Sequence, residues 1–146
     1  MTKVYLAGPM SGIPKFNFPA FIEAARELRD RGFEVVSPAE MDDAEDSGAA
    51  LASPDGCITA HAKVTNKTWG DFLARDVKLI ADSGIEGIVF LPDWTSSRGA
   101  KLEAFAGLLQ KDFKFWRYPP ESGDPLIEVS AMDIFVGIEY GLGFQL

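Results

Sequence analysis

The chain has 146 residues, with 22 acidic side chains against 14 basic ones and a formal net charge of −8. Its length fits one domain, and its 47% hydrophobic composition is too apolar for a disordered chain. An acidic charge without a basic run argues against binding of a nucleic-acid polymer. No apolar run approaches the roughly 18 residues of a membrane-spanning helix, and the N-terminus lacks the layout of a signal peptide. One cysteine and one histidine cannot build a Cys/His zinc site. We therefore expect a cytoplasmic protein that binds neither membrane nor structural zinc.

Strand-like and helix-like patterns alternate along the chain. Strands are predicted over residues 2–7, 33–36, 85–91 and 113–118, and helices over residues 18–31, 69–81 and 98–111. The last of these helices bears four apolar side chains at helical spacing, Leu102, Phe105, Leu108 and Leu109. The alternation predicts a single α/β domain over residues 1–146 of the Rossmann-like (flavodoxin-like) type, a three-layer sandwich around a mainly parallel sheet of about five strands.

Most of the excess negative charge lies in one stretch. Six acids occur there without a lysine or arginine: Glu40, Asp42, Asp43, Glu45, Asp46 and Asp55. Glycine, serine and proline lie among and just after them, which predicts a loop or mobile segment running to about Lys67. A carboxylate metal site is one interpretation, but a solvated acidic loop is favoured. We refer to residues 41–68 as the acidic segment and expect it to be a variable insertion, with residues 119–146 as a C-terminal extension.

Two loops follow strands at positions where open parallel sheets bind their ligands. The first runs from Gly8 through Met10 and Ser11 to Gly12, and the second runs from Pro92 to Ala100. Both are rich in glycine or hydroxyl groups, as an anion cradle must be, and the second leads into a helix N-terminus. This layout suits a small phosphorylated ligand, although ordinary turns have the same composition. The dinucleotide and P-loop fingerprints are absent, which disfavours NAD bound in the Rossmann manner and ATP.

Two carboxylates stand out by their positions on predicted helices. Asp76 lies four residues from both Phe72 and Ile80, so that a charge interrupts an inward-facing stripe. Glu103 lies early in the helix after the second loop, among small residues that leave room for a ligand. Each has a structural alternative, a salt bridge to Arg75 or Lys78 for Asp76 and a helix-dipole interaction for Glu103. Tyr5, near the end of the first strand, can reach the same crevice, although strand tyrosines usually serve packing.

Three stretches together resemble a known family. The run YLAGPMSG, the helix that carries Asp76, and the run LPDWTSSRGAKLEAFAG are similar to the nucleoside 2-deoxyribosyltransferase-like superfamily. The closest branch is that of the 2′-deoxynucleoside 5′-monophosphate N-glycosidases. The resemblance covers about residues 3–118, with the acidic segment unmatched.

This resemblance implies a reaction and its residues. Glu103 matches the nucleophile, which attacks C1′ of the deoxyribose and forms a glycosyl-enzyme intermediate, as carboxylates do in retaining glycosidases. Asp76 matches the acidic residue that contacts the sugar or assists departure of the base, and Tyr5 matches the tyrosine that positions the nucleophile. Because the carboxylate supplies the covalent chemistry, no metal or organic cofactor is implied.

The resemblance also bears on the substrate. Ser97 stands where the hydrolases carry a phosphate-binding serine and the transferases an aspartate, which favours a 5′-monophosphate. Gly8, Met10, Ser11, Gly12 and Gly99 belong to the implied phosphate-binding loops. The family's loop arginine is missing after Gly8, and we expect Arg98 to supply the charge instead.

The remaining expectations concern the base, the tail and the assembly. Trp94, next to Asp93, is the best candidate for a base contact, and Phe16 and Phe18 are further candidates. Ser130 resembles a serine that the hydrolases extend into a neighbouring subunit's phosphate site, and a homodimer or larger homo-oligomer is expected. The alternatives are a deoxyribosyltransferase that exchanges bases and a nucleotide-binding protein without turnover.

Overall fold

The computed structural model describes residues 1–42, 44–121 and 123–140, and the side chain of residue 140 is not described. Asp43 of the acidic segment and the last six residues of the C-terminal extension therefore lie outside the described residues. Within the described part of the chain, every helix is too short or too polar to cross a bilayer.

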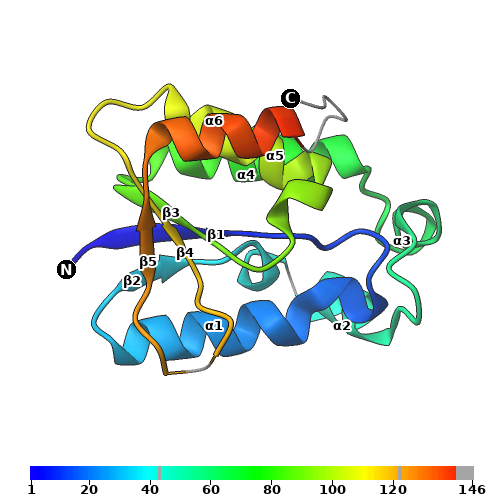
Figure 1. Ribbon diagram of the computed structural model, residues 1–146. Helices are drawn as coiled ribbons and strands as arrows, with labels where there is room; N and C mark the ends of the chain where they lie inside the picture. Colours follow the sequence, from blue (N-terminus) through cyan, green and yellow to red (C-terminus); the bar gives the residue numbers. More distant parts are fainter. Residues whose placement is uncertain (43, 122, 141–146) are drawn as a thin grey trace.

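A five-stranded sheet forms the centre of the molecule (Figure 1). Its strands are β1 (Lys3–Ala7), β2 (Glu34–Val36), β3 (Gly87–Phe90), β4 (Lys114–Arg117) and β5 (Ile127–Val129). Their order is β2-β1-β3-β4-β5, and all neighbours pair in parallel except β4 and β5. The predicted α/β class and the mainly parallel sheet are thus confirmed. The chain turns from one side of β1 to the other between β2 and β3, which places the topological switch point beside the carboxyl end of β1.

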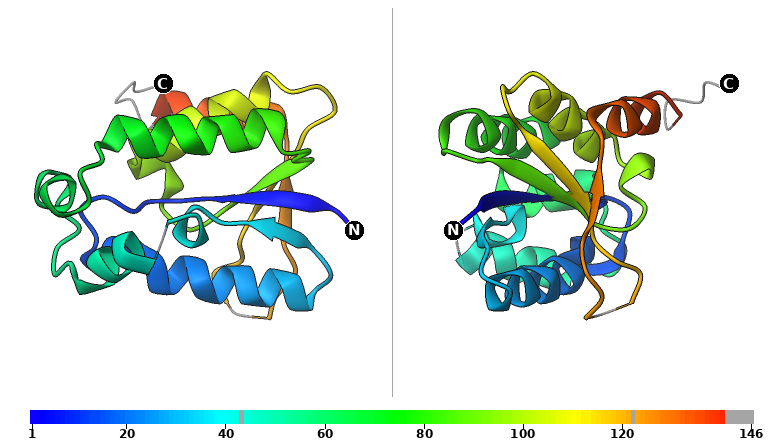
Figure 2. Two further views of the ribbon diagram at one scale, coloured as in Figure 1. Left: turned by 180° about the vertical axis from the view of Figure 1, so that it is seen from behind. Right: turned by 60° about the vertical axis from the view of Figure 1, so that its left-hand side comes forward.

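Helices cover both faces of the sheet, as Figure 2 shows. The longer helices are α1 (Phe18–Asp30), α2 (Ala44–Ala52), α3 (Ile58–Thr65), α4 (Trp69–Asp82), α5 (Arg98–Leu108) and α6 (Ala131–Tyr140). Single 3-10 turns are η1 (Pro14–Asn17), η2 (Pro38–Glu40) and η3 (Trp94–Ser96). Val4 and Leu6 of β1 belong to the apolar core beneath α1, while Tyr5 and Ala7 belong to the core beneath α4, α5 and α6. Because strand side chains alternate between faces, β1 directs Tyr5 to the layer that carries both candidate carboxylates.

The acidic segment is folded, and the prediction of a solvated loop is wrong. It contains α2 and α3, which lie at the end of the sheet where β1 stops (Figure 1). Asp42 and Asp46 have side chains only 5% and 7% exposed, and they form ion pairs with Arg75 and Lys67. Buried carboxylates require such partners, since desolvation of an unpaired charge costs far more than folding can offset.

The C-terminal extension completes the fold on the α5 side. β5 adds an antiparallel edge strand to β4, and α6 packs beside α5. Tyr118 donates a hydrogen bond to Glu27, which also accepts from the Gly123 amide at 2.9 Å. These contacts fasten the start of the extension to α1.

Candidate active site

A cleft opens at the carboxyl end of β1, between α4, α5 and the acidic segment. It contains about 730 Å³ of empty space, a volume that includes solvent at its open mouth. Its lining comprises residues from both predicted loops, from both candidate helices and from the acidic segment: Gly8, Met10, Ser11, Phe16, Phe18, Pro38, Asp42, Ala50, Ile58, His61, Lys67, Trp69, Phe72, Leu73, Arg75, Asp76, Ser97, Gly99, Ala100 and Glu103. The cleft therefore brings residues between positions 8 and 103 together around Asp76 and Glu103.

Glu103 and Asp76 lie on facing helices in this cleft. Glu103 on α5 is 6% exposed and Asp76 on α4 is 7% exposed, yet both line the cleft. α5 presents small side chains and Glu103 inward, with Ala100, Ala104 and Gly107 buried against its neighbours. Small residues bring α5 close to the sheet, since a Cβ on Gly107 would lie 2.9–3.0 Å from the side chains of Phe113, Ile88 and Phe115.

Tyr5 lies beneath Glu103 and donates a hydrogen bond to Glu103 Oε2. The tyrosine is fully buried, and its O–H finds in the carboxylate the partner that a buried hydroxyl requires. Burial and the neighbouring Glu103 charge raise the pKa of Tyr5 well above its usual value, so the hydroxyl keeps its proton. The bond fixes one oxygen of Glu103 and leaves the other available to a ligand.

The two carboxylates do not titrate at ordinary values. Burial raises the pKa of Asp76 to about 6, although the guanidinium of Arg75 opposes this effect. Burial and the Asp76 charge raise the pKa of Glu103 well above its usual range, against the hydrogen bond from Tyr5. Two desolvated acids in one site resist a second ionisation, and the pair therefore passes through a singly protonated form.

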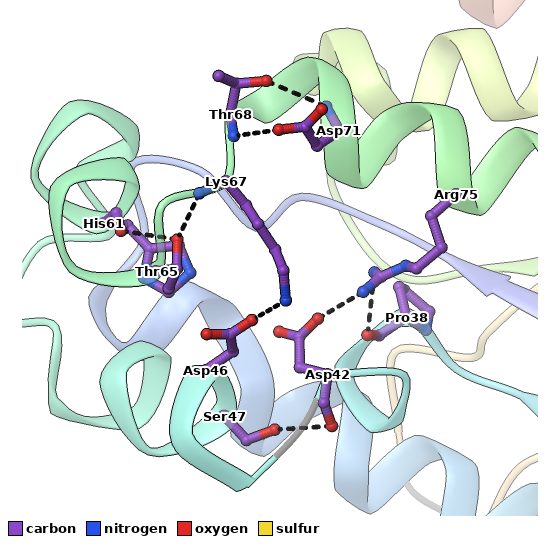
Figure 3. Close-up of polar contacts among 10 residues, drawn as sticks. All are labelled: Pro38, Asp42, Asp46, Ser47, His61, Thr65, Lys67, Thr68, Asp71 and Arg75. Carbon is purple, nitrogen blue, oxygen red and sulfur yellow. Dashed lines mark hydrogen bonds and ion pairs between the residues drawn. The ribbon is translucent and has the colours of Figure 1, made fainter.

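Arg75 connects this pair to the acidic segment. Its Nε donates to Asp76 Oδ1 at 2.9 Å, and its Nη2 lies at ion-pair distance from the same oxygen, also 2.9 Å. Its Nη1 donates to Asp42 (Figure 3). The guanidinium also lies 5.3 Å from the ring centroid of Phe72. Lys67 and Asp46 form a second ion pair in the same region.

A second hollow adjoins the cleft at the N-terminus of α5. Five residues line both cavities: Ser11, Ile58, Trp69, Ser97 and Gly99. Arg98 lines the hollow but not the cleft. Ser97 caps α5 by accepting from the Ala100 amide at 3.1 Å, and its own O–H remains chemically able to donate. Arg98 stacks over Trp69 with 4.9 Å between guanidinium carbon and ring centroid. A helix N-terminus with a hydroxyl and a guanidinium has the chemistry of an anion site.

The match to a protein family covers this whole arrangement. A family model described as a domain of unknown function, DUF4406, matches residues 2–111. The chain belongs to the DUF4406 family. The matched range includes every residue that lines the cleft, whereas β5 and α6 lie beyond it. Comparisons with curated proteins and with solved structures gave no match.

In this DUF4406 protein, most of the predicted site residues lie together. Tyr5, Asp76 and Glu103 form one contacting group, and Gly8, Met10, Ser11, Ser97, Arg98 and Gly99 line the cleft or its hollow. Gly8 approaches the other loop closely, because a Cβ there would lie 2.8 Å from Leu91 Cβ. Two loops that follow neighbouring strands meet at the switch point, as the sequence predicts.

Four predicted site residues lie elsewhere. Trp94 is 7% exposed, lies with its ring centroid 4.4 Å from that of Phe90, and is covered by α6 at Gly137, so it packs in the core and does not line the cleft. Asp93 is exposed in the preceding turn. The Gly12 amide donates to the Gly56 carbonyl at 2.9 Å, which removes it as a phosphate donor. Ser130 is exposed at the start of α6 and accepts from the Asp133 amide at 3.1 Å.

Sequence reasoning missed the contribution of the acidic segment and of the start of α4. Arg75, Asp42, Lys67 and Trp69 all line the cleft. His61 lies between two aromatic rings there, 4.6 Å from Phe16 and 5.7 Å from Phe72. For Arg75, the sequence offered only the salt bridge to Asp76, and the structure confirms that ion pair at 2.9 Å. Among the described residues, no group of three or more His, Cys, Asp or Glu side chains could hold a metal ion.

Proposed function

We propose that the protein hydrolyses the N-glycosidic bond of a 2′-deoxynucleoside 5′-monophosphate, releasing the free base and deoxyribose 5-phosphate. The observation that carries this proposal is the buried group of Tyr5, Glu103 and Asp76, of which both carboxylates line the cleft. Glycosidic bond cleavage commonly uses a pair of carboxyl groups with separated pKa values. One of them acts as the nucleophile and the other as the general acid and base.

The proposed reaction has two steps. In the first step, a carboxylate oxygen of Glu103 forms a bond to C1′ while the C1′–N bond breaks. The departing base takes up the one proton that the Glu103–Asp76 pair holds. In the second, water attacks C1′, the ester bond to Glu103 breaks, and the water proton returns to the pair. Tyr5 holds the second Glu103 oxygen, and Asp76 supports the positive charge that develops on the sugar.

We assign the phosphate of the substrate to the hollow beside the cleft. With C1′ at Glu103, a nucleotide can extend toward Ser97, Arg98 and Ser11, because Ser11 and Ser97 belong to both cavities. The base then lies against the apolar and aromatic part of the cleft, where Phe16 and Phe72 contribute walls. Residues of the acidic segment line the same part of the cleft, and we therefore expect them to determine which base is recognised.

Arg98 provides a direct test of the phosphate assignment. We expect Arg98→Gln to lower kcat/KM for a deoxynucleoside 5′-monophosphate by about tenfold or more, since charge-assisted hydrogen bonds contribute about 1.5–3 kcal/mol. Turnover of the matching deoxynucleoside should be nearly unchanged, because it lacks the phosphate. The measurement is chromatographic release of free base from both substrates.

The same assay, repeated with an added acceptor base, separates the alternatives. Base exchange without net release would make the protein a deoxyribosyltransferase. Tight nucleotide binding without turnover of any substrate would make it a binding protein. Wild-type preference for nucleosides over monophosphates would contradict the phosphate assignment.

We further propose that the protein is a homodimer that uses the α5–α6 surface. Six large apolar side chains on these adjacent helices and their ends are 37–72% exposed: Leu102, Phe105, Leu109, Met132, Phe135 and Val136. Three of the four apolar side chains predicted along α5, Leu102, Phe105 and Leu109, are thus turned outward. Exposed apolar side chains gathered on adjacent helices are typical of interfaces. Ser130 lies at its edge, before α6, and could enter the partner's phosphate site.

Light scattering after size-exclusion chromatography checks the assembly. The wild-type protein should have twice the monomer mass, and Phe135→Glu should reduce it to the monomer mass, because a charge cannot be buried unpaired in the interface. Val64→Glu is the matched control, since Val64 is 67% exposed on α3, away from this surface. A wild-type monomer at all concentrations would contradict the dimer.

A further inference from the structure

Arg75 makes more contacts than an ion pair needs. Besides two contacts to Asp76 Oδ1 at 2.9 Å, it donates to Asp42 and, through Nη2, to the Pro38 carbonyl at 3.4 Å. Its side chain is 30% exposed, while the side chains of its carboxylate partners Asp42 and Asp76 are largely buried. A planar guanidinium can hold two carboxylates in fixed directions at once, which a lysine cannot do.

The two carboxylates that Arg75 bridges come from different parts of the fold. Asp76 belongs to α4 and faces the catalytic group, whereas Asp42 lies between η2 and α2 at the start of the acidic segment. The ion pair between Arg75 and Asp42 spans 33 positions in the sequence. The acidic segment is therefore attached to the residue that neighbours Asp76.

We propose that Arg75 is a positioning residue that fixes the orientation and charge of Asp76, and that Asp42 of the acidic segment holds Arg75 in place for this task. This inference rests on the proposed function in taking Asp76 as a participant in the reaction. The acidic segment then completes the catalytic group as well as covering the cleft.

The surroundings of Asp76 decide what each substitution should do. Charged and titratable groups face it from four directions: Arg75 on its own helix, Asp42 from the acidic segment, Tyr5 from β1 and Glu103 from α5. Lys67 and His61 line the same cleft farther along the acidic segment. Arg75 favours the ionised form of Asp76, and Asp42, as a like charge, disfavours it.

The test is a carboxyl NMR titration of Asp76, with its signal assigned by Asp76→Asn. We expect the wild-type midpoint near pH 6, in accord with the pKa of about 6 that burial and Arg75 produce. Arg75→Gln should raise the midpoint by about 1 pH unit or more, because the opposite charge and its hydrogen bonds are lost. Asp42→Asn should lower it, because the amide can still accept from Arg75 while the like charge is gone.

A matched control comes from the same segment. Asp46→Asn also removes a buried carboxylate paired with a basic side chain, but that side chain is Lys67 rather than Arg75, and the substitution should leave the Asp76 midpoint in place. Shifts of opposite sign in the two test variants support the positioning role. Unchanged midpoints, or shifts of the same sign, would overturn it. Where Arg75→Gln fails to fold, an Asp76 midpoint that Asp42→Asn leaves in place or raises would overturn it.

The titration needs no turnover and so separates this inference from the proposed function. If the wild-type protein releases base, the acid limb of its kcat/KM profile should shift with the Asp76 midpoint in each variant. If it releases no base from any nucleotide, the proposed function fails, while the titration still confirms or overturns the positioning role.

Discussion

Glu103→Gln is expected to reduce base release from a 2′-deoxynucleoside 5′-monophosphate by about a thousandfold or more. The amide keeps the size of the side chain and can still accept from Tyr5, but it cannot form and release an ester at C1′. Loss of a covalent nucleophile has effects of this order or larger in other enzymes. The loss should appear in kcat, because the step that disappears is the chemical one.

The measurement is chromatographic base release under single-turnover conditions, together with nucleotide binding by calorimetry. Glu103→Gln should still bind the nucleotide, since the phosphate hollow and the aromatic walls are intact. Glu128→Gln, on the exposed edge strand β5, is the matched control and should behave as wild type. Equal rates for wild type and Glu103→Gln would rule out Glu103 as the nucleophile.

Gly56→Ala is expected to destabilise the protein by about 2 kcal/mol or more. Gly56 has φ +66°, and an added Cβ would press against the Ile13 carbonyl and lie 2.7 Å from the Ile13 nitrogen. The Gly56 carbonyl also accepts from the Gly12 amide at 2.9 Å. The substitution would push the acidic segment away from the loop after β1 and open the cleft.

Gly48→Ala is the control within the same segment. Gly48 lies in the exposed face of α2 with no atom within 4 Å of an added Cβ, and alanine there should stabilise the helix by about 0.5–1 kcal/mol. Urea denaturation of both variants measures the difference. Equal stabilities would mean that the acidic segment is not docked on the loop after β1.

The order of strands and helices follows from local patterns. Apolar runs that end in Gly-Pro or Pro-Asp mark β1 and β3, and the period of α4 places Asp76 on its inward face beside Ile80. These features depend on neighbours a few residues apart, which is why a single sequence suffices to predict them. The meeting of the loops after β1 and β3 follows in turn from the rule that parallel strands end at one edge.

The acidic segment could not be predicted in this way. Its carboxylates read as solvated because no cation lies near them in the sequence, whereas Asp46 pairs with Lys67 over 21 positions and Asp42 with Arg75 over 33. The burial of Trp94 could not be predicted for a similar reason, since it depends on α6, which lies more than thirty positions later in the sequence. Long-range pairing of this kind has no local periodicity.

The net charge of −8 illustrates the difference between what the sequence determines and what the tertiary structure decides. The sequence by itself predicted an α/β domain with Asp76 in the inward stripe of one helix and Glu103 among small residues of another. Only the tertiary structure decided that Glu103, Asp76 and Tyr5 form one buried group, and that two acids of the acidic segment are neutralised at its edge. The physical reason is desolvation, because the cost of burying a charge is set by the partners that the fold brings to it, not by its neighbours in the chain.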